Sequence, residues 1–358
     1  MSLAYHVYQC RWSTKLQPDL SNNSLKYVPD LSRVPPTTGV VVLVGVTTTL
    51  GDQVISALAL SPISLSFTPL LIDQALTHRS FPDYSAPRAS LIRISPFAFR
   101  VDLETGYGFS DISDAFGEPH VVVNCAALSV PRDCERNPSA AMDVNVPHYL
   151  VKWFTDFSEM PLLIHLSCDQ VYEGVKSFYK EEDETVPVNE YGKSKVEAEQ
   201  YISINCLNYV ILRSSIIYGP QTVSPVPTYL PIQLIDTVLS KKTKVDFFYD
   251  EFRCPVYVKD VVSIILTLIT KYFSEGRYMQ LLLNVAGPDR VSRVQMAEAV
   301  ASVRGYNSSL INPISASSVN RAVKTPADIS MDISRLIQLL GITPTSFIDG
   351  VRLTLASF

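Results

Sequence analysis

Residues 40–51 read VVVLVGVTTTLG, and this stretch decides the fold. Five consecutive valine or leucine residues are typical of a strand that is buried on both faces of a parallel sheet. A glycine follows at once, and residues 50–60 then carry apolar side chains at helical spacing. A buried strand, a tight glycine turn and a helix are how a nucleotide-binding βαβ unit begins. The stretch therefore predicts a doubly wound α/β fold.

The turn itself departs from the usual glycine pattern. In such a unit the first glycine makes the turn, the second lets the main chain approach the pyrophosphate, and the third packs the helix against the strand. Gly45 and Gly51 stand at the first and third places, but Thr48 occupies the second. Threonine adds a branched side chain there and tolerates a positive φ poorly. A helix N-terminus can still bind an anion, so a nucleotide turn and an ordinary strand-to-helix turn both stay open.

Composition narrows the class of protein. The 358 residues are 47% hydrophobic and 18% charged, as expected of a globular chain with a real core. A net charge of −5 without a basic cluster gives no support for nucleic acid or an anionic membrane as a partner. Apolar runs such as residues 261–269 are too short to span a bilayer. Six scattered cysteines without metal-ligand spacing predict reduced thiols in a cytoplasmic protein and no metal site.

The pattern along the chain indicates two parts. Strand-like runs at residues 120–128, 162–172 and 209–219 alternate with helical stretches at 133–142, at 146–157 and from Tyr191 onward. This alternation predicts a Rossmann-type parallel sheet over residues 39–219. Two more strands are expected at 70–78 and 90–99. Residues 1–38 are expected to be a poorly ordered extension.

A Pro-rich loop follows Gly219, and shorter mixed elements come after it. Residues 220–358 are therefore expected to form mainly a smaller C-terminal α/β substrate lobe, with some elements returning to the first domain. Helices are expected near residues 230–239, 259–273, 292–303 and 333–340.

The motif YGKSK, residues 191–195, carries the clearest chemistry. Tyr191 and Lys195 are four residues apart, which places a phenol and an ammonium on one face of a helix. A neighbouring ammonium is expected to lower the pKa of the phenol from about 10, making Tyr191 a proton donor near neutral pH. The same spacing occurs by chance on solvated amphipathic helices. The motif gains weight because it follows LSCDQVY, a strand that ends in polar residues.

Five motifs together resemble a known superfamily. NCAA (124–127), MDVNVP (142–147), LSCDQVYEG (166–174), YGKSK (191–195) and LRSSIIYGP (212–220) occur in the order of the extended short-chain dehydrogenase/reductases. The chain most resembles the dTDP-4-dehydrorhamnose reductase (RmlD-like) group, which includes the regulatory β subunit of methionine adenosyltransferase. YKEEDETVPVNEYGKSKVEAE (179–199), DEFRCPVYVKDVV (250–262) and PADISMDISRL (326–336) carry this closer likeness, which spans about residues 39–355.

The resemblance implies catalytic roles for three residues. Tyr191 would be the general acid that protonates a ketone oxygen, and Lys195 would hold the nicotinamide ribose and tune the phenol. Cys168 stands where the group has a Thr or Ser whose hydroxyl orients the carbonyl. A thiol is a weaker hydrogen-bond donor, and Ser167 points to the opposite face of the strand. Cys168 is equally well explained as a small buried apolar residue.

The resemblance also implies a set of binding residues and an NADP cofactor, with NAD as the alternative. Arg79 is a candidate contact for a 2′-phosphate, which would favour NADP. The implied cofactor-binding residues are Gly45, Thr48, Gly51, Asp102, Asn124, Ala126, Ala127, Lys195, Arg213 and Ser214. Ser215 and Arg253 are implied at the substrate.

Three functions follow as hypotheses. The first is NADPH-dependent reduction of a 4-keto nucleotide sugar or a similar carbonyl. The second is a non-catalytic regulatory subunit that contacts a methionine adenosyltransferase catalytic subunit, for which Thr48 and Cys168 would be harmless. The third, a generic nucleotide-sensing scaffold, has no positive support in the sequence. Fold alone does not choose among them.

Overall fold

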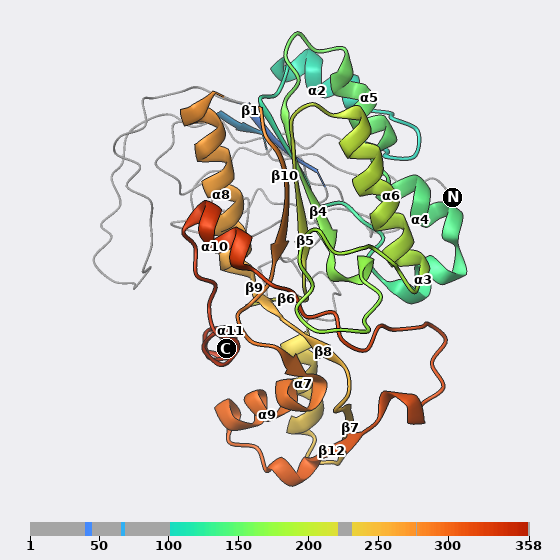
Figure 1. The fold of residues 1–358 in the computed structure, drawn as a ribbon, viewed down its shortest axis with the longest axis vertical. Coiled ribbons are helices and arrows are strands. Elements are labelled where there is room, and N and C mark those ends of the chain that lie inside the picture. The colour runs from blue at the N-terminus through green and yellow to red at the C-terminus, as the bar shows by residue number, and fades with distance from the viewer. Residues whose placement is uncertain (1–39, 45–65, 69–100, 221–230, 277, 357–358) are drawn as a thin grey trace, which may run out of the picture.

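The computed structural model describes residues 40–44, 66–68, 101–220, 231–276 and 278–356. In these residues six strands form one parallel sheet in the order β10-β5-β4-β3-β1-β2 (Figure 1). The strands are β1 (Val40–Val44), β2 (Ser66–Thr68), β3 (Val121–Asn124), β4 (Leu162–Cys168), β5 (Tyr209–Ser214) and β10 (Gln280–Val285). The predicted α/β fold class with a parallel sheet is confirmed.

The strand order contains a reversal of the kind at which α/β sheets bind ligands. β2 is added on one side of β1, whereas β3 lies on its other side, so the order of addition reverses between β1 and β3. In sheets of this kind, ligands bind outside the carboxyl ends of the strands at such a reversal. The register places Val44 beside Asn124 at that edge. The opening stretch of the sequence thus leads directly to the expected binding edge.

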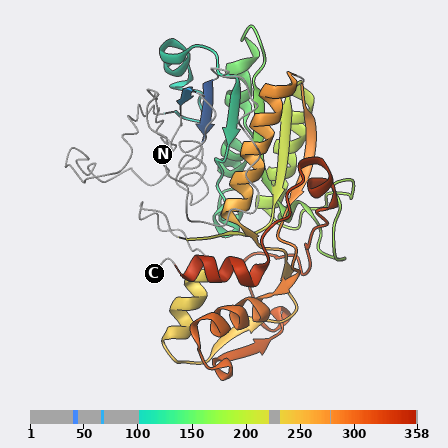
Figure 2. The same cartoon turned by 90° about the vertical axis from the view of Figure 1, so that its left-hand side faces the viewer.

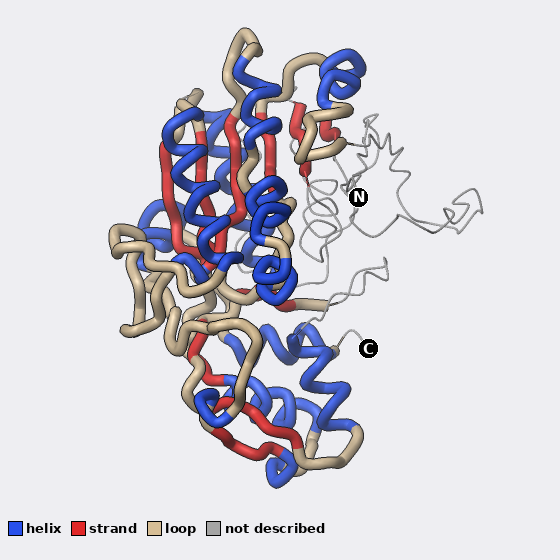
Figure 3. Tube along the Cα trace, turned by 90° about the vertical axis from the view of Figure 1, so that its right-hand side faces the viewer, coloured by secondary structure: helices blue, strands red, loops and turns tan. Residues whose placement is uncertain are grey.

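Helices cover both faces of the sheet (Figures 1, 2 and 3). One face carries α3 (Pro131–Arg136), α4 (Pro138–Asn145), α5 (His148–Thr155) and α6 (Glu190–Asn205), and α2 (Phe109–Phe116) packs against α5. The other face carries α8 (Val258–Glu275) and α10 (Ser334–Leu340). α8 buries a stripe at helical spacing formed by Val261, Ile264, Ile265 and Leu268, which fixes the face that it turns to the core.

A smaller group of elements lies beneath the sheet in Figure 1. It contains α7 (Pro231–Ser240), α9 (Arg293–Arg304) and α11 (Phe347–Leu355). Three short strand pairs complete it: β7 (Val245–Phe248) with β12 (Ile311–Ile314), β8 (Phe252–Arg253) with β11 (Val291–Ser292), and β6 (Ile217–Tyr218) with β9 (Val256–Tyr257). β10, α8 and α10 follow residue 219 in sequence but lie on the sheet.

Several elements differ from the sequence expectation. The helix expected at 133–142 is two helices, because Asn137 caps α4 through the Ala140 N–H and Pro138 occupies its first turn. The strand expected at 209–219 ends at Ser214, and β6 joins a different sheet. α11 was not expected.

Two other expectations fall where little is described. The strands expected at 70–78 and 90–99 lie outside the described residues, whereas β2, at Ser66–Thr68, was not foreseen. In the described part of the chain, no helix is long and apolar enough to cross a membrane.

Candidate functional site

The candidate site lies at the carboxyl edge of the central strands. β3 ends at Asn124, β4 at Cys168 and β5 at Ser214, and the register pairs Cys168 with Ser214. Gly45, Thr48 and Gly51 lie outside the described residues, as does Arg79, so their cofactor roles stay predictions.

The first turn of α6 is fixed against the segment that follows β4. Asn189 caps the helix by accepting a hydrogen bond from the Gly192 N–H at 2.9 Å. Its amide also donates to Gln170 Oε1 at 2.8 Å. Gly192 is needed at this contact, because a Cβ there would collide with the backbone oxygen of Gln170. The two contacts set the position of Tyr191, which lies between Asn189 and Gly192 in sequence.

Tyr191 and Cys168 meet in a buried cluster. Their side chains pack together with Cys134, Ala141 and Leu128. Burial raises the pKa of the Cys168 thiol to about 12 and that of the Tyr191 phenol well above its ordinary value. The expectation that a lysine lowers the pKa of this phenol is wrong, because burial raises that pKa. Both groups keep their protons at neutral pH.

Lys195 is directed into the sheet. Its side chain is 1% exposed, and Nζ donates to the Leu166 carbonyl at 2.6 Å and lies 3.3 Å from His165 Nε2. The other ring nitrogen of His165 lies 3.1 Å from Asn124 Nδ2. Asn124 Oδ1 in turn accepts from the Ala126 N–H at 3.1 Å. The helix, β4 and the end of β3 are therefore joined by one chain of polar contacts.

His165 and Asn145 are site residues that sequence reasoning missed. Asn145, on α4, donates to Ser194 Oγ at 2.8 Å and exchanges hydrogen bonds with the backbone of Leu128. It thereby ties the loop after β3 to α6 beside Tyr191. Asn145 stands in the motif MDVNVP, which by itself predicts no role for it. A lone polar residue in an apolar run, as in LLIHLSC for His165, was the available signal.

The Arg213 side chain is buried, and its hydrogen-bond partners lie within the protein. Its guanidinium contacts the Glu199 carboxylate on α6 at 2.7–3.1 Å and donates to Tyr172 Oη at 2.9 Å. Glu199 also accepts from Ser167. The structure thus places Arg213 with Ser167 and Glu199 and not with Tyr191, because partners in a parallel register share a face of the sheet.

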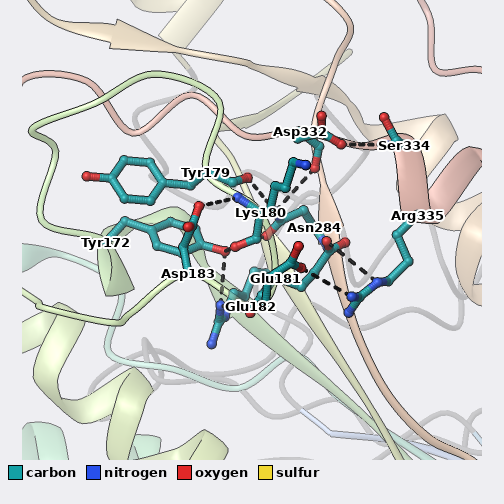
Figure 4. A network of polar contacts seen from close by, with 11 residues as sticks. Tyr172, Tyr179, Lys180, Glu181, Glu182, Asp183, Asn284, Asp332, Ser334 and Arg335 are labelled. Atoms are coloured by element: carbon teal, nitrogen blue, oxygen red, sulfur yellow. Dashed lines mark hydrogen bonds and ion pairs between the residues drawn. The ribbon is translucent and has the colours of Figure 1, made fainter.

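This ion pair continues into a network around β10. Figure 4 shows Tyr172, Glu181 and Asn284 at its centre. Tyr172 donates to Asn284 Oδ1 at 2.8 Å, and Glu181 accepts from the Asn284 backbone N–H at 2.9 Å. The Arg335 Nε lies 3.8 Å from a Glu181 carboxylate oxygen. The network joins the loop after β4 to β10 and α10, so it holds the sheet beneath the site.

Ser215 and Arg253 both act on the buried carboxylate of Asp169. Ser215 Oγ donates to Asp169 Oδ2 at 2.9 Å, while Ser214 Oγ donates to the Ser215 carbonyl. Arg253 is 2% exposed and donates to the carbonyls of Phe252, Pro326 and Ala327. Burial, followed by the charge of Arg293, lowers the pKa of Arg253 to about 10. Arg253 therefore stays charged at neutral pH, and its described contacts are with the backbone of its own chain.

Asp102 and Ala127 complete the predicted set. Asp102 follows an isolated bridge residue, and its Oδ1 accepts from the Glu104 N–H at 2.8 Å, which closes a turn. Ala127 is half-buried just after β3, beside the buried Ala126. In the described residues no cluster of three or more His, Cys, Asp or Glu side chains could hold a metal ion.

Solved structures share this fold at low identity. The dTDP-4-dehydrorhamnose reductase of Bacillus anthracis, crystallised with NADP, superposes with a TM-score of 0.69 at 19% identity, covering 90% of this chain and 100% of that one. The RMD protein of Pseudomonas aeruginosa, complexed with NADPH, gives 0.65 at 18% identity over 89% and 98%. These likenesses concern the fold, and they agree with a Rossmann-type sheet.

Relatives found by sequence comparison share a higher identity with this chain than these solved structures do. The methionine adenosyltransferase 2 subunit beta of Bos taurus is 31% identical over 244 residues, which cover 67% of this chain and 71% of the relative. A probable low-salt glycan biosynthesis reductase, Agl14, of Haloferax volcanii is 29% identical over 241 residues, covering 66% and 77%. The model of the RmlD substrate binding domain matches residues 89–358. The chain belongs to the RmlD substrate-binding domain family.

Proposed function

We propose that the chain is an NADPH-dependent reductase that converts the carbonyl of a 4-keto nucleotide sugar, or of a similar small molecule, to an alcohol. The observation that carries the proposal is the contact between the Tyr191 phenol and the Cys168 thiol at the carboxyl end of β4. Since burial raises the pKa of the phenol, Tyr191 keeps its proton and can act as a general acid. Reductases among the relatives and solved structures support the proposal.

The proposed chemistry divides between cofactor and protein. A bound nicotinamide would supply a hydride to the carbonyl carbon. As the C=O π bond breaks, the oxygen gains a negative charge and takes the proton of the Tyr191 hydroxyl. Cys168 would orient the carbonyl, although a thiol donates a weaker hydrogen bond than a hydroxyl does. Arg213 would act as a positioning residue, since it holds α6 through Glu199.

The residues present fit a dinucleotide at the reversal between β1 and β3. Ala126 and Ala127 follow β3 with only methyl side chains, and Asn124 fixes the Ala126 backbone. Lys195 and Ser214 would lie at the nicotinamide end, and Asp102 at the adenine end. Gly45, Thr48 and Gly51 would form the phosphate turn.

A fluorescence titration with NADPH, followed by turnover of dTDP-4-dehydrorhamnose, tests the proposal. Tyr191→Phe should bind NADPH within about twofold of the parent but lose at least ~100-fold in kcat, because it removes only the acid. Tyr201→Phe is the matched control on the same helix, where the ring packs edge-on against His148. Equal turnover by Tyr191→Phe and the parent would overturn the role of Tyr191. Absence of NADPH binding at millimolar concentration would overturn the proposal that the chain is a reductase.

A regulatory role is the second candidate, and a specific observation favours it. Methionine adenosyltransferase 2 subunit beta from several vertebrates matches at up to 31% identity, and Cys168 weakens the case for catalysis. The chain would then bind a methionine adenosyltransferase catalytic subunit and need no turnover. Co-purification of the two chains at micromolar concentration, with unchanged association for Tyr191→Phe, supports this candidate. No complex under those conditions would remove it.

A further inference from the structure

We propose that His165 holds Lys195 as an uncharged amine in the resting protein, through the hydrogen-bond chain Asn124–His165–Lys195–Leu166. His165 is thus a positioning residue that sets the charge of a lysine it contacts. The proposal deepens the proposed function, on which its catalytic meaning rests, but the proton positions follow from geometry alone.

The argument starts at a backbone group that can only donate. The Ala126 N–H points at the side-chain amide of Asn124 at 3.1 Å, so the atom facing it is Oδ1. Nδ2 therefore faces His165 Nδ1, at 3.1 Å. An amide nitrogen has no lone pair to offer, so Nδ1 must be the acceptor and carries no proton. This excludes the imidazolium and fixes the neutral tautomer with its proton on Nε2.

The same reasoning passes to the lysine. Nε2–H of His165 lies 3.3 Å from Lys195 Nζ. An ammonium offers three donors and no acceptor, so two donors would face each other. A neutral amine resolves the conflict, because its lone pair accepts from Nε2–H while one of its N–H groups donates to the Leu166 carbonyl at 2.6 Å. Every donor in this series of hydrogen bonds then faces an acceptor.

Burial of Lys195 supports the neutral form. Burial lowers the pKa of Lys195 and brings that of His165 well below its ordinary value. Four described groups act in the opposite direction and would raise this pKa if they were ionised: the thiols of Cys125, Cys134 and Cys168 and the Glu199 carboxylate. The thiols stay protonated, because burial raises the pKa of each to about 11 or 12.

The Glu199 charge raises the pKa of Lys195, but this carboxylate is paired with another cation. Its carboxylate already contacts Arg213 Nε and Nη2 and accepts from Ser167. A buried ammonium without a free counterion is costly, and lysine loses its proton readily in such places. The resting site would therefore consist of an uncharged phenol, thiol and amine.

Nuclear magnetic resonance of the full chain tests the proposal without substrate or cofactor. Lysine labelled at Cε and Nζ and histidine labelled at both ring nitrogens report the charge of the amine and the tautomer of the ring. At pH 8 we expect one lysine in the neutral-amine form and one neutral histidine with Nε2–H. Lys195→Met and His165→Gln should each remove the corresponding signal and so assign it. Since the chain has only five histidines, the ring signals are few enough to resolve.

Asn124→Asp supplies the sharper test. An aspartate accepts from both the Ala126 N–H and His165 Nδ1–H, so the ring proton should move to Nδ1 and Lys195 should become an ammonium. An ammonium signal for Lys195 in the parent protein at pH 8, or an Nδ1–H tautomer of His165, would overturn the proposal. An unchanged tautomer in Asn124→Asp would also do so. Failure to bind NADPH would instead remove the proposed function and leave these spectra as they are.

Discussion

At the scale of single residues, burial governs the chemistry of the candidate site. Cys168 is 7% exposed, and burial raises its pKa to about 12. At pH 8 its thiolate fraction should be roughly a thousandfold below that of an ordinary cysteine with a pKa near ~8.5. We therefore expect iodoacetamide to leave Cys168 unmodified in the folded protein and to alkylate it promptly in denaturant. Peptide mass spectrometry after timed quenching measures this, and rapid labelling of the native chain would contradict it.

His165 should make stability depend on pH. Burial brings its pKa well below 6.5, so the native ring stays neutral where the unfolded ring takes up a proton. The unfolded state then binds more protons, and the free energy of unfolding falls as pH drops below about 6.5, by up to about 1.4 kcal/mol per pH unit from this group. Denaturant titrations between pH 5 and 7.5 should show a shallower slope for His165→Gln than for the parent. His148→Gln, at an exposed position, is the matched control.

At the scale of elements, the first turn of α6 depends on a close backbone approach. Gly192→Ala would push its new methyl into the Gln170 carbonyl and toward Pro187. We expect a loss of about 1–3 kcal/mol in the free energy of unfolding, as is typical when a packed contact is overfilled. Tyr191 should shift with the helix, so kcat should fall as well. Gln200→Ala, on an exposed position of the same helix, is the control and should change neither. A Gly192→Ala protein with parental stability would show that the turn is free to move.

The body of α6 is held by a buried ion pair. Glu199→Gln leaves the Arg213 guanidinium buried without its counter-charge, and such losses cost about 3–5 kcal/mol. The exposed pair of Lys193 with Glu190, on the same helix, is solvated, so Lys193→Ala should leave the denaturation midpoint essentially unchanged. Chemical denaturation of the two variants side by side measures the difference. Comparable midpoints for both would mean that the buried pair adds no net stability.

At the scale of the whole molecule, the sequence predicts the sheet better than it predicts the contacts beneath it. Mainly apolar runs predict β1, β3, β4 and β5, because a strand buried on both faces needs such runs. Tyr191, Lys195 and Cys168 could be named because local motifs carry them. His165 could not be paired with Asn124, nor Arg213 with Glu199, since these contacts join residues 41 and 14 positions apart through the fold. The charge of Lys195 depends on such contacts, so no local pattern reports it.

The same long-range character bears on where the chain can be divided. The expected boundary at residue 219 separates β5 from β10, although the two strands pair along six residues from Tyr209 and Gln280 onward. It also removes α8, which covers one face of the sheet (Figure 2). A fragment of residues 1–219 would expose Val210 and Leu212 and leave β5 as an open edge.

We therefore expect this fragment to aggregate or to lack fixed tertiary structure, whereas the full chain unfolds with β10 and β5 in one transition. Near-ultraviolet circular dichroism and the dispersion of amide resonances distinguish the two outcomes. The full chain, purified under the same conditions, is the control. A monomeric 1–219 fragment with native-like dispersion would show that the sheet is complete without β10, and that the returning elements are an addition to an independent domain and not part of its core.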